Sequence, residues 1–233
     1  MFTNIIKNRC PLKQVVVLSL LLALCSVGFA QEAGKINRMN GTVSVTNASG
    51  KKTAKSGDVV MVGDTIEAGK DSEAFVKLKD NSTLIVRPAS KVQIAEFRFE
   101  KKPTDTAKTS LIEGSLRAVS GQISKGKPDS VKFQAGTATI GIRGTDIDLA
   151  IIPEGAKDRA GIYNYVTTGE VLMALESGES LVVPKESTGF SPAKPEPGEA
   201  KLQLLRDRPA FFQSGGFDAL MQQLMTPQVP MGR

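Results

Sequence analysis

The sequence predicts an all-β protein, an antiparallel sandwich or jelly-roll-like roll with a short helical tail at its C-terminus. Three observations support this fold class. Apolar and polar residues alternate in short runs rich in Val, Ile, Thr and Phe, which is the pattern of half-buried strands. Turn-forming residues separate these runs about every 8–12 residues. No helical periodicity appears before residue 190, which argues against a parallel α/β fold.

The clearest predicted strands lie in the first half of the chain. Residues 42–46 alternate strictly, and residues 74–79 and 82–87 alternate less strictly. Asp80 and Asn81 join the last two runs, so we expect a hairpin in which Asn81 takes the positive φ of a tight turn. Further strands are expected at residues 91–99, 110–119, 130–140, 147–152, 161–168, 170–175 and 180–183.

The N-terminus has the three-part layout of a secretory signal peptide. Residues 1–13 carry three basic side chains and no acid, and residues 14–27 form a short apolar stretch. Gly28 and Ala30 supply the small residues that a signal peptidase requires before Gln31. The apolar stretch is shorter than the roughly 20 residues that span a bilayer. We therefore expect a periplasmic or secreted mature chain, with no stable membrane insertion after signal cleavage.

The chain is predicted to have three parts. Residues 1–30 are the signal peptide, residues 31–190 the β domain, and residues 191–233 a Pro-rich linker followed by a helical tail. A lipid anchor on Cys25 is an alternative to cleavage, but bulky Leu24 stands where such signals need a small residue. The tail is predicted from apolar residues at helical spacing, namely Phe217, Leu220, Met221, Leu224 and Met225. We expect this apolar face to cover the β domain, with docking on a partner as the alternative.

Composition excludes several kinds of catalytic and metal site. The chain has no His and no Trp, and its two cysteines, Cys10 and Cys25, lie in the predicted signal peptide. A mature chain therefore lacks the residues for a Ser-His-Asp triad, a Cys nucleophile or a Cys/His zinc site. Basic residues are scattered among acids and aromatic residues make up only 5%, which argues against a nucleic-acid surface. We expect no enzyme activity, no cofactor and no metal.

Five short motifs occur in a fixed order along the predicted β domain. They are Gly-x-Val-x-Val at residues 41–45, Gly-Asp-x-Ile-x-x-Gly at 63–69, Asp-Asn-Ser at 80–82, Leu-x-x-Gly-x-x-Arg at 111–117 and Arg-Gly-Thr-Asp at 143–146. In these motifs the chain resembles the FecR-domain family, named after the periplasmic part of an iron-dicitrate signalling regulator. Asn81 replaces a Gly of the family's hairpin, a change that the same turn allows. The resemblance covers residues 35–190.

The resemblance implies a function in the bacterial cell envelope. Founding members of the family carry a cytoplasmic anti-sigma segment and a membrane helix before this domain, whereas here we expect only a cleavable signal. The chain therefore resembles the secreted, stand-alone kind of FecR domain, and signal relay across the inner membrane does not carry over. The expected function is a non-catalytic periplasmic interaction module, with a signalling role left open. Its expected partner is a cell-envelope protein or glycan.

The Arg-Gly-Thr-Asp turn is the candidate binding site. The resemblance assigns it Arg143, Gly144, Thr145 and Asp146. Arg143 has five N–H donors that can hold loop carbonyls or pair with Asp146, so we expect it to act mainly as a structural staple. Its replacement by Ala is then expected to act mainly on stability.

Two carboxylates underlie the alternative function, hydrolysis of an envelope glycan. Asp146 and Asp148 lie two residues apart, so on a continuing strand both side chains face the same side. Such a pair can bind a hard cation or perform acid–base chemistry. We expect instead one turn acid and one solvent-facing acid. A third possibility is a structural scaffold that docks through its C-terminal helix.

Overall fold

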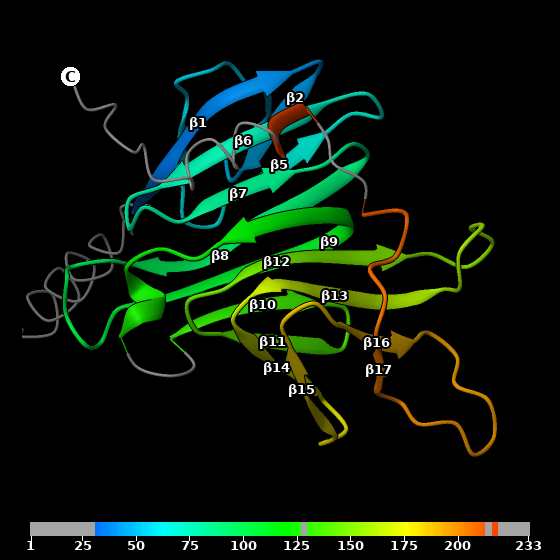
Figure 1. Cartoon of the computed structure of the whole chain (residues 1–233). Helices are drawn as coiled ribbons and strands as arrows, with labels where there is room; N and C mark the ends of the chain where they lie inside the picture. The colour runs from blue at the N-terminus through cyan, green and yellow to red at the C-terminus, as the bar shows by residue number, and fades with distance from the viewer. Residues whose placement is uncertain (1–30, 127–129, 213–215, 219–233) are drawn as a thin grey trace, which may run out of the picture. The chain divides into compact units, whose positions relative to one another are not determined.

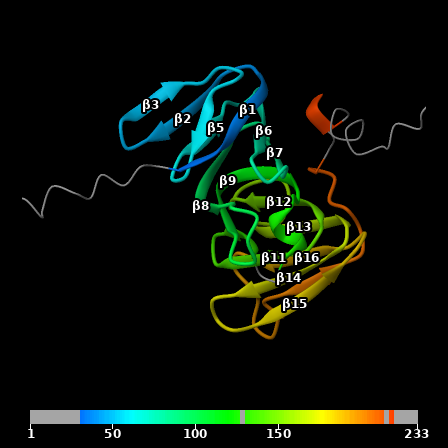
Figure 2. The same cartoon turned by 90° about the vertical axis from the view of Figure 1, so that its left-hand side faces the viewer.

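The computed structural model describes residues 31–126, 130–212 and 216–218, and the regular secondary structure in these residues is almost entirely β-strand (Figures 1 and 2). The predicted signal peptide lies outside the described residues. The strands are β1 (Glu32–Asn40), β2 (Val43–Asn47), β3 (Gly50–Thr53), β4 (Val59–Met61), β5 (Thr65–Ala68), β6 (Glu73–Leu78), β7 (Thr83–Val86), β8 (Ser90–Arg98), β9 (Thr106–Val119), β10 (Val131–Ala135), β11 (Ala138–Ile142), β12 (Asp146–Ile152), β13 (Gly161–Thr168), β14 (Glu170–Leu175), β15 (Ser180–Pro184), β16 (Thr188–Pro192) and β17 (Gln203–Leu205). The all-β prediction is confirmed.

The strands form two sheets that enclose one large hydrophobic core. Sheet A has the order β4-β1-β6-β7-β9-β12-β13-β16-β17. Sheet B has the order β3-β2-β5-β8-β9-β10-β11-β14-β15. Pairing is antiparallel throughout the described residues except between β9 and β10. Alternate residues of both sheets, from Ala33 to Val183, meet in the core, as expected for a sandwich.

Strand β9 belongs to both sheets. Its first half pairs with β8 and β10 in sheet B, and its second half pairs with β7 and β12 in sheet A. The change of sheet falls at Gly114, whose φ of 78° is in the left-handed region. A Cβ atom on this residue would lie 2.3 Å from Ser90 Oγ and 2.6 Å from the Ala89 carbonyl oxygen. The crossing therefore requires glycine for both its torsion angle and its space.

Replacing Gly114 by Ala is expected to lower the free energy of unfolding by about 2 kcal/mol, because strain and steric overlap add. Urea denaturation measures this loss. Gly57→Ala is the matched control, since Gly57 also has a positive φ but has open space around its Cα. The control should cost about 1 kcal/mol or less. Equal losses in the two variants would show that the close approach at Gly114 has no energetic weight.

The hairpin predictions are confirmed at one place and corrected at another. Asn81 has a φ of 68°, and β6 and β7 pair on either side of it as expected. The single strand expected over residues 130–140 is wrong. The structure has two strands there, β10 and β11, joined by a tight turn in which Gly136 has a φ of 50°. Ala135 and Ala138 face each other across that turn.

The β fold continues beyond residue 190. β16 pairs with β13, and β17 pairs with β16, so part of the predicted linker belongs to sheet A. Residues 206–212 and 216–218, here called the C-terminal segment, then contact the outer face of sheet A. Residues 216–218 are helical, whereas Leu220, Met221, Leu224 and Met225 lie outside the described residues. None of the described helices is long and apolar enough to span a membrane.

Candidate functional site

The outer face of sheet A carries a row of charged side chains on its central strands. Arg87 directly follows β7, Arg117 lies on β9, and Asp146 and Asp148 lie on β12. In the sheet register Arg117 stands opposite Asp148. The intervening residues of these strands face the hydrophobic core, so strand alternation turns the charged side chains to the opposite face. This confirms that Asp146 and Asp148 share one side of their strand.

The charged side chains form a closed network with the C-terminal segment. Arg117 binds Asp146 through two hydrogen bonds, Nε to Oδ1 at 3.0 Å and Nη2 to Oδ2 at 2.6 Å. Asp218 accepts hydrogen bonds from Arg117 Nη1 at 2.7 Å and from Arg87 Nη1 at 2.9 Å. Arg87 Nη2 also donates to Asp148 Oδ1 at 2.8 Å. Asp218 therefore joins two ion pairs that belong to different strands.

Asp148 is held by arginines from two sides. Arg208 of the C-terminal segment donates from Nη2 to Asp148 Oδ2 at 2.9 Å, and its guanidinium lies 5.3 Å from the centre of the Tyr165 ring. With Arg87 on Oδ1, each carboxylate oxygen of Asp148 has a guanidinium partner. Three arginines thus face three aspartates in this arginine–aspartate cluster, which balances its charge.

All members of the cluster except Arg208, whose side chain is 36% exposed, are buried, and this burial governs their electrostatics. Asp148 is 0% exposed, and Asp146 and Asp218 are at most 2% exposed. Burial raises the pKa of Asp148, and the opposing effect of the nearby guanidinium groups, Arg87 first, is smaller. Burial lowers the pKa of Arg117, but hydrogen bonds to Asp146 and Asp218 outweigh it and hold this pKa above its ordinary value. Arg117 is therefore a permanent cation in the cluster.

Two expectations about these residues are wrong. Asp146 and Asp148 are not a turn acid and a solvent-facing acid, because both are buried and bound by arginines. Asp146 pairs with Arg117 instead of Arg143. The carbonyl of Thr145 is bound by the Ser120 backbone N–H at 3.0 Å, so it does not need a guanidinium either. The ion-pair network therefore includes Asp146 of the Arg-Gly-Thr-Asp motif, but its arginine is Arg117 and not Arg143.

The Arg-Gly-Thr-Asp turn divides between inside and outside. Thr145 and Asp146 are buried, whereas Arg143 and Gly144 are exposed. Gly144 has a φ of 65°, which reverses the chain between β11 and β12. Within the described residues Arg143 makes no hydrogen bond or ion pair. The second half of the turn is therefore part of the buried structure, whereas the first half is open to solvent.

Arg143 borders a hollow of about 280 Å³ on the outer face of sheet B. Gly141 of β11 contributes no side chain there, and Leu172 of β14 stands opposite it. Val182 of β15 is the next residue across the sheet. Leu172 and Val182 are 42% and 50% exposed, so two aliphatic side chains lie in the open beside a cation. We call Arg143, Gly141, Leu172 and Val182 the Arg143 surface.

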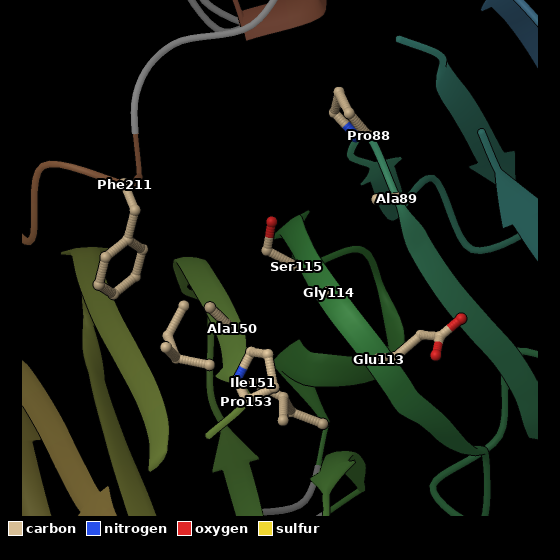
Figure 3. A pocket seen from close by; sticks show the side chains of 10 residues that line it. Pro88, Ala89, Glu113, Gly114, Ser115, Ala150, Ile151, Pro153 and Phe211 are labelled. Carbon is tan, nitrogen blue, oxygen red and sulfur yellow. The ribbon is translucent and has the colours of Figure 1, made fainter. Parts of the chain in front are cut away.

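A second hollow of about 430 Å³ lies on the outer face of sheet A, where β9 leaves for sheet B (Figure 3). Figure 3 shows Pro88 on one side, the Phe211 ring on the other, and Ser115 and Ala150 between them. Phe211 is fixed by an edge-on contact with Tyr163, with the ring centres 5.0 Å apart. The lining is largely apolar, so this hollow has few polar or charged groups with which to bind or react with a ligand.

No metal centre forms in residues 31–126, 130–212 and 216–218, where no three His, Cys, Asp or Glu side chains converge as ligands would. The arginines explain this at β12, because each carboxylate there already has a cationic partner.

Comparison with known proteins gives a family match and similar crystal structures. Residues 64–172 match a family model described as FecR protein. No curated protein matches the chain. Two crystal structures of a protein described as an anti-sigma factor from Parabacteroides distasonis ATCC 8503 are similar, with TM-scores of 0.49 and 0.47 and 13% identity. The similarity covers 61% of this chain and 59% of those chains, which is less than two thirds of their length.

The matched region contains most of the features described above. It runs from the turn before β5 into β14 and includes Arg87, Arg117, Asp146 and Asp148 of the cluster together with the exposed Arg143. The motifs at residues 80–82, 111–117 and 143–146 all lie inside it. Residues 64–172 of this chain therefore belong to the FecR-domain family.

Proposed function

We propose that the chain is a non-catalytic FecR-domain module of the periplasm that binds another protein of the bacterial cell envelope through the Arg143 surface. The observation that carries this proposal is the exposure of Arg143. The arginines of the buried cluster each have carboxylate partners, whereas Arg143 has none among the described residues. An exposed guanidinium beside aliphatic side chains is suited to a partner that offers a carboxylate next to an apolar group.

The chemistry of the Arg143 surface favours a protein over a glycan. Leu172 and Val182 are large apolar side chains left in solvent, a feature of protein interaction sites when they are grouped. The residues lining the hollow include no aromatic ring on which a sugar could stack. A periplasmic location is supported by the signal-like composition of residues 1–30, and a signalling-related role by the family.

The two alternatives have less support. A glycan hydrolase needs a carboxyl group that reaches its substrate, but Asp146 and Asp148 are buried and bound by arginines. A scaffold that docks through its C-terminal helix needs a free apolar face. The described part of that helix packs on its own sheet, with Phe217 and Phe75 ring centres 6.0 Å apart.

Replacing Arg143 by Ala is expected to abolish partner binding while changing the free energy of unfolding by less than about 0.5 kcal/mol, as is usual for an exposed side chain. The test uses a photo-crosslinking amino acid at position 172, in the full chain expressed in its bacterial host, with crosslinked products read from the periplasmic extract. Arg38→Ala is the matched control, because Arg38 is an exposed arginine on β1 in the other half of the protein.

The outcomes separate binding from stability. Loss of the crosslink in Arg143→Ala but not in Arg38→Ala supports the proposal. A crosslink that survives in Arg143→Ala contradicts it. A marked fall in melting temperature of Arg143→Ala would restore the earlier expectation that this residue is a structural staple.

A further inference from the structure

Strand β15 differs from the strands at the other sheet edges. β3 carries Lys51 and Lys52, and β4 and β17 are only three residues long. Lysines and short length both discourage pairing with another chain. β15 has five residues, Ser180–Pro184, and none of them is charged. Within the described residues it pairs only with β14, so its outer side is an open edge.

The hairpin between β14 and β15 fixes which backbone groups face outward. The Leu175 N–H donates to the Glu179 carbonyl at 2.8 Å, which makes these two residues a hydrogen-bonded pair. Bonded and non-bonded pairs alternate along an antiparallel ladder. Ser180, Val182 and Pro184 therefore direct their backbone groups away from β14. Since Pro184 has no N–H, the open edge offers the N–H groups of Ser180 and Val182 and the carbonyls of all three.

The charges flanking β15 are arranged symmetrically about its centre. Glu179 lies three residues before Val182, and Lys185 lies three residues after it. If a second copy pairs antiparallel with Val182 opposite Val182, Glu179 of each copy faces Lys185 of the other. Val182, which is 50% exposed, is then covered by its symmetry mate and lies beside Leu172. The strand is thus complementary to itself in charge and in apolar contact.

We propose that two copies of the chain form a dimer in which their β15 strands pair antiparallel about a twofold axis at Val182. The two Val182 residues exchange both backbone hydrogen bonds, and each Ser180 N–H donates to the Pro184 carbonyl of the second copy. Centring the pair on Pro184 would lose both central donors, and centring it on Ser180 would separate the charges. This inference goes beyond the proposed function. The dimer takes Val182 into its seam and leaves Arg143, Gly141 and Leu172 of both copies on the same face of one continuous sheet.

The first test measures the mass of the full chain in solution by sedimentation over a concentration series. We expect a dimer for the natural sequence. Val182→Lys should weaken dimerisation by about tenfold or more, because two like charges then face each other on the paired edge. Leu204→Lys is the matched control, since Leu204 is 47% exposed on the edge strand β17 of the other sheet. It should leave the dimer intact.

The second test reverses the flanking charges. Glu179→Lys or Lys185→Glu alone places like charges opposite each other and should weaken the dimer, while the double variant should restore it. Glu179 also pairs with Lys201 at 2.7 Å, so melting temperature is recorded to separate folding from association. A natural chain that stays monomeric overturns the proposal. So does a dimer that survives Val182→Lys, or one that Leu204→Lys disrupts equally.

Discussion

Replacing Arg117 by Met is expected to lower the free energy of unfolding by about 4 kcal/mol, the largest loss predicted for a single side chain here. Methionine preserves much of the apolar volume but leaves Asp146, which is 1% exposed, without the two hydrogen bonds that compensate its burial. Asp218 loses its 2.7 Å hydrogen bond from Arg117 at the same time. Urea denaturation, followed by far-ultraviolet circular dichroism, measures the loss.

Arg143→Met is the control for this variant, because it makes the same chemical change at an exposed position. It should cost less than about 0.5 kcal/mol. Similar losses in the two variants would contradict the view that the buried cluster, rather than arginine content, stabilises the fold. A near-neutral Arg117→Met would mean that water or a neighbouring cation compensates Asp146.

Ending the chain at residue 213 is expected to cost about 3 kcal/mol, because apolar and ionic contacts are lost together. Phe217 packs on a small cluster formed by Phe75 and Ile85 on the outer face of sheet A. Without it these side chains are open to solvent, and Arg87 and Arg117 lose their shared carboxylate. Thermal unfolding and binding of a hydrophobic dye report the two effects.

Asp218→Ala in the full chain separates the ionic part of that loss. Its cost is bounded by the free energy with which the C-terminal segment docks, because undocking lets water reach the arginines. We therefore expect a smaller loss, about 1–3 kcal/mol. If the shortened chain melts like the full one and binds no dye, residues 214–233 do not stabilise the β fold, and docking on a partner becomes the better hypothesis.

Strands were predictable where one face of a regular ladder is buried. β13 and β14 have the predicted bounds, and β12 begins one residue earlier than expected. β1 was missed because a bulge between Ile36 and Arg38 shifts its register and breaks the alternation. β17 was missed because its three residues show no buried face. Period-2 patterns therefore identify regular strands, the edge strand β15 among them, but not bulged or very short ones.

The candidate site was only half predictable. The spacing of Asp146 and Asp148 showed that they share a face, because this depends on strand geometry alone. Their partners come from distant parts of the sequence. Arg117 is 29 residues from Asp146, and Arg87 is 131 residues from Asp218. No local pattern indicates such pairs. Without these arginines, the spacing of Asp146 and Asp148 suggests a catalytic or cation-binding pair. With the arginines bound to them, the two carboxylates stabilise the fold.

Because β9 crosses between the sheets, residues 64–172, which the family model matches, are shorter than the unit that can fold. A fragment limited to residues 64–172 keeps β9 but removes β1 and β2, the partners of β6 and β5. It also removes β15 and β16, which pair with β14 and β13. Because one strand connects both layers, neither half can be cut away without opening the other. A useful truncation must therefore follow the pairing of the strands, not the limits of family similarity.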